Sequence, residues 1–462
     1  MNQQYEDIYG NVFSIDKELS SGGQGIVYKT REPNVLLKIE WNSQTKKINI
    51  NTEDNKKFDE IRLLPIPQNT NITLPQSILK DCVGYSMRML EDMISFEDAF
   101  RYGNEDYRNT WLEEFGESNP EFVKGFGKYI STGGKRRRIS AFLSVAGILA
   151  VIHTRGLVYG DLSDKNMYIS SEPDRNVVWM IDVDNINFIS VTSKRNGIFS
   201  PGYVAPEILN GKGNTFYSDI YSFAIALFWN LTGQHPFVGP QLEEKLDEED
   251  FLSGTEETFA CGCDVEWIKD DEDGENASDT PIPYELLVGD KLNNCFKKTF
   301  SRTGRHKRLT RPTMMEWGEA LAYELDTSIK CRKCEMEYNP MLHEACPWCD
   351  EKNQYISLSC KKDKMDDASQ VYFHEIGNKV KVPLRLLNGF MVSEINEIIF
   401  EILEDNGKTM IEKFNNRFDF EHKQGDTYRK IFGKMQLIEN TEIRVTEKTT
   451  GEKYLVNYSL KG

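Results

Sequence analysis

A short glycine-rich segment near the start of the chain has the composition of a phosphate-binding loop. Residues 20–28, SSGGQGIVY, lie between two strand-like segments and contain Gly22, Gly23 and Gly25. Glycine lets the backbone approach a phosphate closely, with its N–H groups facing the anion. The loop leads into a strand, whereas Walker and dinucleotide-binding loops lead into a helix. A plain hairpin with glycines has a similar sequence, so the interpretation needs support from other residues.

A lysine surrounded by aliphatic residues supplies part of that support. Lys38 lies in the next predicted strand, residues 35–39, VLLKI. A buried ammonium needs an anion, which a bound phosphate and a carboxylate would provide. Glu60, in the helical pattern of residues 56–64, is the expected carboxylate, and Glu53 is the second candidate. The alternative is a lysine on an edge strand that points to water.

Further polar residues follow apolar elements at fixed spacing. Residues 139–152 have helical periodicity, and after a turn and a strand come Asp161 and, five positions later, Asn166. The apolar strand 177–181 ends in Asp182. The order of glycine loop, strand lysine, Asp-x-x-x-x-Asn and strand-ending aspartate resembles that of the protein kinases.

This resemblance implies phosphoryl transfer from ATP with Mg²⁺, a reaction that depends on positioned charge. Asp161 would accept the proton of the substrate hydroxyl, and Asn166 and Asp182 would hold magnesium. Lys38 would steady the phosphates while paired with Glu60. Residues 84–90 would form the adenine-binding strand and hinge, with Met87 as gatekeeper. The full set of expected nucleotide contacts is Gly22, Gly23, Gly25, Val27, Lys38, Met87, Arg88, Met89, Leu90, Asn166 and Asp182.

The resemblance continues downstream and covers about residues 10–325. Residues 205–207, Ala-Pro-Glu, match the end of an activation segment, Asp219 matches the aspartate that braces the catalytic loop, and Arg311 would pair with Glu207. For this part of the chain the resemblance implies an α+β fold class, a bilobal kinase-like domain. Its expected parts are a small lobe (10–95) and a large lobe (96–325) with an acidic, solvated insertion (238–283).

Several positions depart from the family pattern. Tyr159-Gly160 replace His-Arg, Ser163 replaces a lysine, and Asp184 replaces the glycine of Asp-Phe-Gly. These changes support an alternative, a nucleotide-binding pseudokinase scaffold without turnover. A small-molecule kinase is a third hypothesis, weakened by the Ala-Pro-Glu segment. Ser200 stands where Ser/Thr kinases keep a hydroxyl, so serine and threonine are the expected substrates.

Four cysteines have the spacing of a metal site. Cys331 and Cys334, and then Cys346 and Cys349, form two Cys-x-x-Cys pairs, and four thiolates suit tetrahedral Zn²⁺ in a structural role. The zinc ribbon would span residues 326–352. A redox pair is the alternative, but no βαβ pattern surrounds either motif. Cys261 and Cys263 form a separate Cys-x-Cys segment, which is a weaker candidate for a second metal site.

Charge and hydropathy exclude some classes of partner. The net charge of −17 argues against a broad nucleic-acid or anionic-membrane surface. The basic run 135–138, KRRR, is interpreted as a solvated helix start. No run of about 18 apolar residues is present, and the first residues do not resemble a secretion signal, so a cytoplasmic location is expected.

The remaining segment, residues 353–462, alternates like strands and predicts a small β-rich docking module. The Gly160–Ser163 sequence, the acidic insertion and the cysteine pairs together resemble the kinase of the tellurite-resistance-linked phosphorylation triad. That resemblance implies a von Willebrand A-domain protein as substrate and a metal-dependent Ser/Thr phosphatase as antagonist.

Overall fold

The computed structural model describes residues 3–21, 25–42, 45, 47–101, 103–244, 265–365, 370–377 and 379–462. Gly22 and Gly23 of the glycine loop, and the Cys261–Cys263 segment, lie outside these residues. Within the described residues, no helix is both long enough and apolar enough to cross a membrane.

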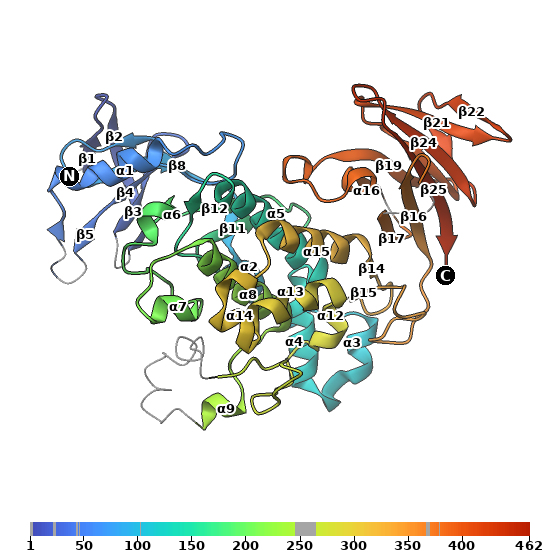
Figure 1. The fold of residues 1–462 in the computed structure, drawn as a ribbon, viewed down its shortest axis with the longest axis horizontal. Coiled ribbons are helices and arrows are strands. Elements are labelled where there is room, and N and C mark those ends of the chain that lie inside the picture. Colours follow the sequence, from blue (N-terminus) through green and yellow to red (C-terminus); the bar gives the residue numbers. More distant parts are fainter. Residues whose placement is uncertain are drawn as a thin grey trace.

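The small lobe is one antiparallel sheet with a single short helix packed on it (Figure 1). The strand order is β1-β2-β3-β4-β8-β7, and α1 is anchored through the Asn55 side chain, which bonds the carbonyls of Leu79 and Cys82. Its elements, with the small β5–β6 ladder, are β1 (Gln4–Glu6), β2 (Val12–Ser21), β3 (Ile26–Thr30), β4 (Val35–Ile39), β5 (Trp41–Asn42), β6 (Lys47–Ile48), α1 (Lys56–Arg62), β7 (Ser77–Ile78) and β8 (Gly84–Arg88).

The large lobe is helical and encloses the main hydrophobic core. Helix α8 illustrates how local sequence sets the elements: a capping box at Thr215 and Ser218 begins it, and Gly233, at φ +78°, ends it. The helices are α2 (Phe96–Arg101), α3 (Thr110–Phe115), α4 (Pro120–Ser131), α5 (Gly134–His153), α6 (Ile189–Thr192), α7 (Pro206–Leu209), α8 (Phe216–Thr232), α9 (Pro240–Glu243), α12 (Tyr284–Leu287), α13 (Asp290–Phe300), α14 (Arg302–His306) and α15 (Met314–Asp326). The short strands are β9 (Met93–Ser95), β10 (Leu157–Val158), β11 (Met167–Ser170), β12 (Val178–Met180) and β13 (Asn187–Phe188).

The basic run at the start of α5 is not solvated, contrary to the sequence-based expectation. Lys135, Arg137 and Arg138 are each at most 5% exposed. Lys135 pairs with Glu324 at 2.5 Å, while Arg138 donates to backbone carbonyls and stacks 4.2 Å from the Tyr129 ring centroid. Buried carbonyl oxygens and a buried carboxylate satisfy these cations, so the run joins elements of the core.

The described part of the acidic insertion, residues 265–283, also differs from the expectation of a solvated loop. Val265, Trp267 and Ile268 are each 1% exposed and belong to the main core. Asn276, fully buried, donates to the carbonyls of Phe237 and Glu266. The few apolar residues of this acidic segment are therefore enough to anchor it.

The C-terminal third holds a two-stranded hairpin and two β-sheets with their own core. One sheet has the order β17-β16-β25-β24-β21-β22 and the other β18-β19-β20-β23. In Figure 1 these sheets lie on the other side of the helical lobe from the small-lobe sheet. The elements are β14 (Ile329–Lys330), β15 (Glu337–Tyr338), β16 (Tyr355–Lys362), β17 (Gln370–Glu375), β18 (Val380–Pro383), α16 (Arg385–Asn388), β19 (Ile398–Asp405), β20 (Lys408–Glu412), β21 (Phe418–Gln424), β22 (Thr427–Lys430), β23 (Met435–Gln436), β24 (Thr441–Glu447) and β25 (Lys453–Lys461).

Candidate active site

Three neighbouring strands of the small lobe place one residue each on the same face. Val27 of β3 lies opposite Lys38 of β4, and Lys38 lies opposite Tyr85 of β8. Directly opposed residues of antiparallel strands point to the same face, and side chains alternate along a strand, so Met87 belongs to this face too. The face therefore carries Lys38, Val27 and Met87, which are expected nucleotide contacts.

At the end of the glycine loop, the backbone of Gly25 lies too close to the end of β4 for a side chain to fit between them. A β carbon on Gly25 would lie 2.7 Å from the Ile39 carbonyl oxygen. Glycine is therefore required at this position for packing, and the packing fixes the end of the loop over β4. The Met89 amide bonds the Asn34 carbonyl at 2.9 Å, so this amide is used by the sheet rather than open to adenine.

Lys38 joins the two lobes through a pair of carboxylates. Its Nζ lies 2.6 Å from Asp182 Oδ1 and 2.7 Å from Asp184 Oδ2. Burial alone would lower the pKa of Lys38, but attraction to Asp184 and Asp182 outweighs it and raises that pKa above the usual value. The lysine and the strand-ending aspartate, 144 residues apart, thus meet at one site.

The structure does not form the expected pair between Lys38 and Glu60. Phe58 and Ile61 are the buried residues of α1. At 100° per residue, Glu60 lies on the side of α1 away from Phe58, and it is exposed. The second candidate, Glu53, is exposed as well. Among the described residues, the carboxylates that pair with Lys38 are Asp182 and Asp184.

The segment between β10 and β11 carries both Asp161 and Asn166. Ser200 Oγ donates to Asp161 Oδ1 at 2.8 Å, and Asn166 Nδ2 donates to the Asp161 carbonyl at 2.8 Å. The Ile181 amide bonds the Asn166 carbonyl at 3.0 Å, which ties Asn166 to the residue before Asp182. Burial raises the pKa of Asp161, and the bond from Ser200 opposes that rise.

The backbone at the strand-ending aspartate is unusual. Asp182 has a φ of +56°, in the left-handed region that few residues other than glycine adopt. Such conformations cost free energy and cluster at functional sites. The contact with Lys38 helps to hold Asp182 in this conformation.

A buried aspartate on α8 supports the catalytic segment, as the sequence indicated. Asp219 accepts hydrogen bonds from the amides of Tyr159 at 2.8 Å and Gly160 at 2.9 Å. His153 Nε2 lies 3.0 Å from the same carboxylate. The Tyr159 hydroxyl donates to the Ile181 carbonyl, so the tyrosine that replaces histidine links the catalytic segment to the Asp182 turn.

The predicted ion pair between Glu207 and Arg311 is present in the core. Arg311 donates through two nitrogens to the two carboxylate oxygens of Glu207, at 2.8 and 2.9 Å. It also donates to the carbonyls of Gly304 and Tyr217. This pair fixes α7, at the end of the segment that carries Ser200, against the base of the large lobe.

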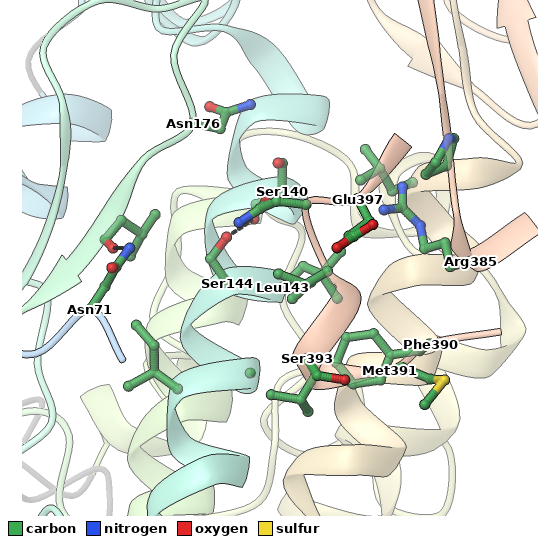
Figure 2. Close-up of a pocket in the computed structure, with 18 of the residues that line it drawn as sticks. Asn71, Ser140, Leu143, Ser144, Asn176, Arg385, Phe390, Met391, Ser393 and Glu397 are labelled. Atoms are coloured by element: carbon green, nitrogen blue, oxygen red, sulfur yellow. Dashed lines mark hydrogen bonds between the residues drawn. The ribbon is translucent and has the colours of Figure 1, made fainter. Parts of the chain in front are cut away.

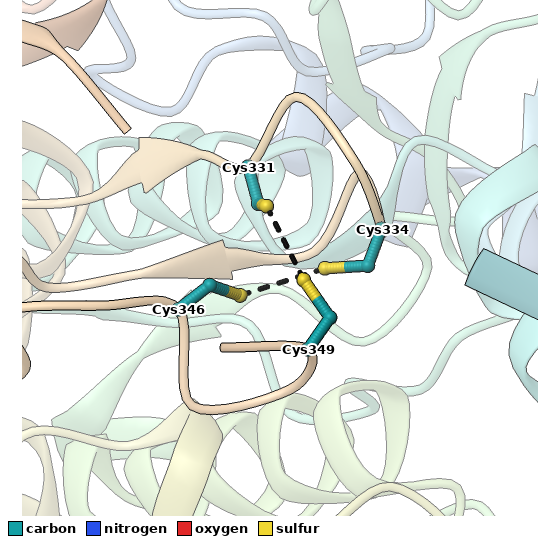
Figure 3. A group of neighbouring side chains, drawn as sticks. All are labelled: Cys331, Cys334, Cys346 and Cys349. Carbon is teal, nitrogen blue, oxygen red and sulfur yellow. Dashed lines mark hydrogen bonds between the residues drawn. The ribbon is translucent and has the colours of Figure 1, made fainter. Parts of the chain in front are cut away.

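The four predicted zinc ligands come together in one cluster (Figure 3). The Cys331 and Cys349 sulfurs lie 3.6 Å apart, and the Cys334 and Cys346 sulfurs 3.5 Å apart. A tetrahedral Zn²⁺ with sulfur at about 2.3 Å separates its ligands by about 3.8 Å. Disulfides need about 2.0 Å. The donor set and its spacing therefore fit a four-thiolate zinc site with no open coordination position.

The cysteine cluster packs on the large lobe instead of forming a separate module. Its buried cysteines belong to the same hydrophobic core as the kinase-like helices. Trp348 contacts Phe126 of α4 at 5.5 Å between ring centroids, and Asn109 donates to the Cys334 carbonyl at 2.9 Å. The cluster thus contacts α4 and the residue that caps α3.

A wide groove of about 1620 Å³ lies away from these candidate site residues, between α5, α15 and the C-terminal sheets. Figure 2 shows Ser140, Leu143 and Ser144 of α5 on one side and Phe390 and Met391 on the other. Lys38, Asp161, Asn166 and Asp182 are absent from its lining. Its lining comes from both the large lobe and the C-terminal sheets, which also contact each other through the Arg136–Glu375 and Asp326–Arg385 ion pairs.

Two functional contacts escaped the sequence interpretation. From the sequence, Tyr85 is only a residue of a predicted strand, and Asp184 is only a replacement of the family's glycine. The structure connects them: the Tyr85 hydroxyl donates to Asp184 Oδ1 at 2.7 Å, next to Lys38. The sequence signal for this contact was the carboxylate of Asp184, which replaces the family's glycine two residues after the predicted metal ligand Asp182.

Comparison with known proteins agrees with this geometry. The family model described as "Protein kinase domain" matches residues 13–316, about two thirds of the chain. The curated relatives include a "Probable serine/threonine-protein kinase 2" of Plasmodium falciparum (32% identical over 124 residues, 27% of this chain and 24% of the relative). They also include serine/threonine-protein kinases of Lactococcus lactis (32% over 124 residues, 26% of this chain, 20% of the relative) and Myxococcus xanthus (30% over 147 residues, 28% and 18%). The matches span about a quarter or less of these relatives' lengths.

Proposed function

Because this chain belongs to the protein kinase family, we propose that it transfers the γ-phosphoryl group of magnesium-bound ATP to serine or threonine of a protein partner. The single observation that carries the proposal is the meeting of Lys38 from the small lobe with Asp182 from the large lobe, at 2.6 Å. Asp161 and Asn166 stand on the adjoining segment. This is the arrangement that phosphoryl transfer by positioned charge requires.

Each side chain has a distinct role in the proposed reaction. Lys38 binds the phosphates, while Asn166 and Asp182 are the oxygen ligands that would hold Mg²⁺. Magnesium supplies charge neutralisation of the phosphate oxygens. Asp161 orients the acceptor hydroxyl and takes its proton, and the Ser200 hydroxyl keeps the Asp161 carboxylate in place. Val27, Met87 and the backbone of residues 88–90, apart from the Met89 amide that bonds Asn34, would surround the adenine.

The choice of serine or threonine rests on Ser200 and on the relatives. Ser200 Oγ donates to Asp161, the residue proposed to take the proton of the acceptor hydroxyl. Several relatives are named serine/threonine-protein kinases. The narrower resemblance to the tellurite-resistance-linked triad nominates a von Willebrand A-domain protein as acceptor and a metal-dependent phosphatase as antagonist. The proposed location is the cytoplasm. The four-cysteine cluster is proposed to hold structural Zn²⁺.

Co-expression with a candidate acceptor tests the proposed activity. Intact-mass analysis is expected to find the acceptor heavier by one or more phosphoryl groups with the wild type, and unmodified with Asp161→Asn. The matched control is Asp174→Asn, an exposed carboxylate elsewhere on the large lobe, which should behave as the wild type. ATP binding without phosphorylation of any acceptor, including the chain itself, would favour the pseudokinase scaffold instead.

A further inference from the structure

Asp184 stands where the family's Asp-Phe-Gly segment has glycine, and its side chain lies inside the site. That side chain is 9% exposed. Asp182 has a positive φ, whereas Asp184 is not among the described residues with that conformation. The backbone at position 184 therefore accepts a side chain without strain, so a carboxylate can occupy this position.

Both oxygens of Asp184 are held by specific partners. Oδ2 lies 2.7 Å from Lys38 Nζ, and Oδ1 accepts a hydrogen bond from the Tyr85 hydroxyl at 2.7 Å. Lys38 and Tyr85 are directly opposed on β4 and β8. The carboxylate thus bridges two adjacent strands of the small lobe and fixes the position of the ammonium.

Helix α1 supports this bridge with an aromatic ring instead of a carboxylate. Phe58 of α1 packs against Tyr85, with ring centroids 4.7 Å apart, and Tyr85 is 1% exposed. Glu60 of the same helix is exposed. Helix α1 therefore orients the Tyr85 hydroxyl that holds Asp184, while the Glu60 carboxylate of the same helix is exposed to solvent.

The two carboxylates beside Lys38 differ in solvent exposure. The Asp182 side chain is 28% exposed and that of Asp184 is 9% exposed. When Asp182 serves a metal ion, its charge is shared with that ion, and a buried ammonium then needs another anion. Asp184 meets that need because its contacts lie within the protein.

We propose that Asp184 is the positioning residue for Lys38, in the role that the family pattern assigns to Glu60. The inference rests on the proposed function, since it assigns a residue to the same site. Lys38 would keep its contact with Asp184 while it binds the phosphates, and Tyr85 would keep the carboxylate oriented.

Steady-state phosphorylation kinetics of the full chain test the assignment. Asp184→Asn keeps the side-chain shape and removes the charge, so kcat should fall by about tenfold or more, the loss of a charge-assisted hydrogen bond. The KM for ATP should change less than kcat, because adenine contacts remain. Glu60→Gln should stay within about twofold of the wild type, and Tyr85→Phe should fall between the two.

A double-mutant cycle separates positioning from a general loss of structure. Once Lys38→Ala has removed the ammonium, adding Asp184→Asn should cost no further activity. Additive losses in the double variant, or a larger loss in Glu60→Gln than in Asp184→Asn, would overturn the assignment.

A crystal structure of the wild-type chain with magnesium and a non-hydrolysable ATP analogue gives an answer that does not depend on turnover. Lys38 Nζ within hydrogen-bond distance of Asp184 supports the assignment, and Lys38 bonded to Glu60 overturns it. An inactive wild type that keeps the Asp184 contact with bound nucleotide would count against the proposed function and not against this inference.

Discussion

Arg311→Met is predicted to destabilise the large lobe strongly. Arg311 and Glu207 are 3% and 8% exposed, and two parallel hydrogen bonds join them. The substitution leaves a buried carboxylate without its partner, which typically costs about 3–5 kcal/mol. Arg311 also donates to the carbonyls of Gly304 and Tyr217, so the upper part of that range is expected. For a domain of this size, the melting temperature should fall by about 10 °C.

The assay is thermal melting at a fixed scan rate, with two further variants as controls. Arg302→Met changes an exposed arginine on α14 and should shift the free energy of unfolding by less than about 0.5 kcal/mol. The double variant Glu207→Met with Arg311→Met removes both charges and should recover at least half of the loss. An Arg311→Met melting temperature within about 2 °C of the wild type, or a double variant at least as unstable as the single one, would refute the reasoning.

Three further predictions concern the metal cluster, the base and the glycine loop. Cys346→Ala should remove one zinc per chain by elemental analysis and lower the melting temperature by about 10 °C, whereas Cys360→Ala should keep the zinc. Asp161 must be ionised to accept a proton, and its pKa is raised, so kcat/KM should fall as the pH drops through that pKa. Ser200→Ala removes the hydrogen bond that opposes the rise in the pKa of Asp161, so the acidic limb of the pH profile should move to higher pH. An unmoved limb would contradict this coupling. Gly25→Ala places a β carbon 2.7 Å from a carbonyl oxygen and should raise the KM for ATP about tenfold in initial-rate measurements, and an unchanged KM would show that the loop end is not fixed in this way.

Sequence motifs predicted the parts of the site whose residues lie close together in the sequence. Asp161 and Asn166 are joined within one turn, and Asp219 bonds the backbone of the catalytic segment as expected. The pair between Glu207 and Arg311 is long-range, yet it was accessible because both residues sit in recognisable motifs. The kinase resemblance implied the bilobal fold, and residue spacing indicated the cysteine cluster.

The missed features depend on three-dimensional packing. Whether Glu60 faces Lys38 depends on which side of α1 packs on the sheet, and Phe58 and Ile61 decide that. The basic run beginning at Lys135 has a composition typical of a solvent-exposed segment. Partners from distant segments, such as Glu324, make its burial favourable. The same holds for Trp267 in an acidic segment. For the basic run, the deciding partner lies far away in the sequence.

The most direct test of the central claim is transfer of labelled phosphate from γ-labelled ATP to protein in the presence of magnesium. The wild type should label serine or threonine residues of an acceptor or of itself, and Asp161→Asn and Asp182→Asn should each reduce the rate by about a hundredfold or more. Equal labelling by the wild type and both variants, or no labelling by a wild type that binds ATP, would contradict the claim that Lys38, Asp161, Asn166 and Asp182 form one phosphoryl-transfer site.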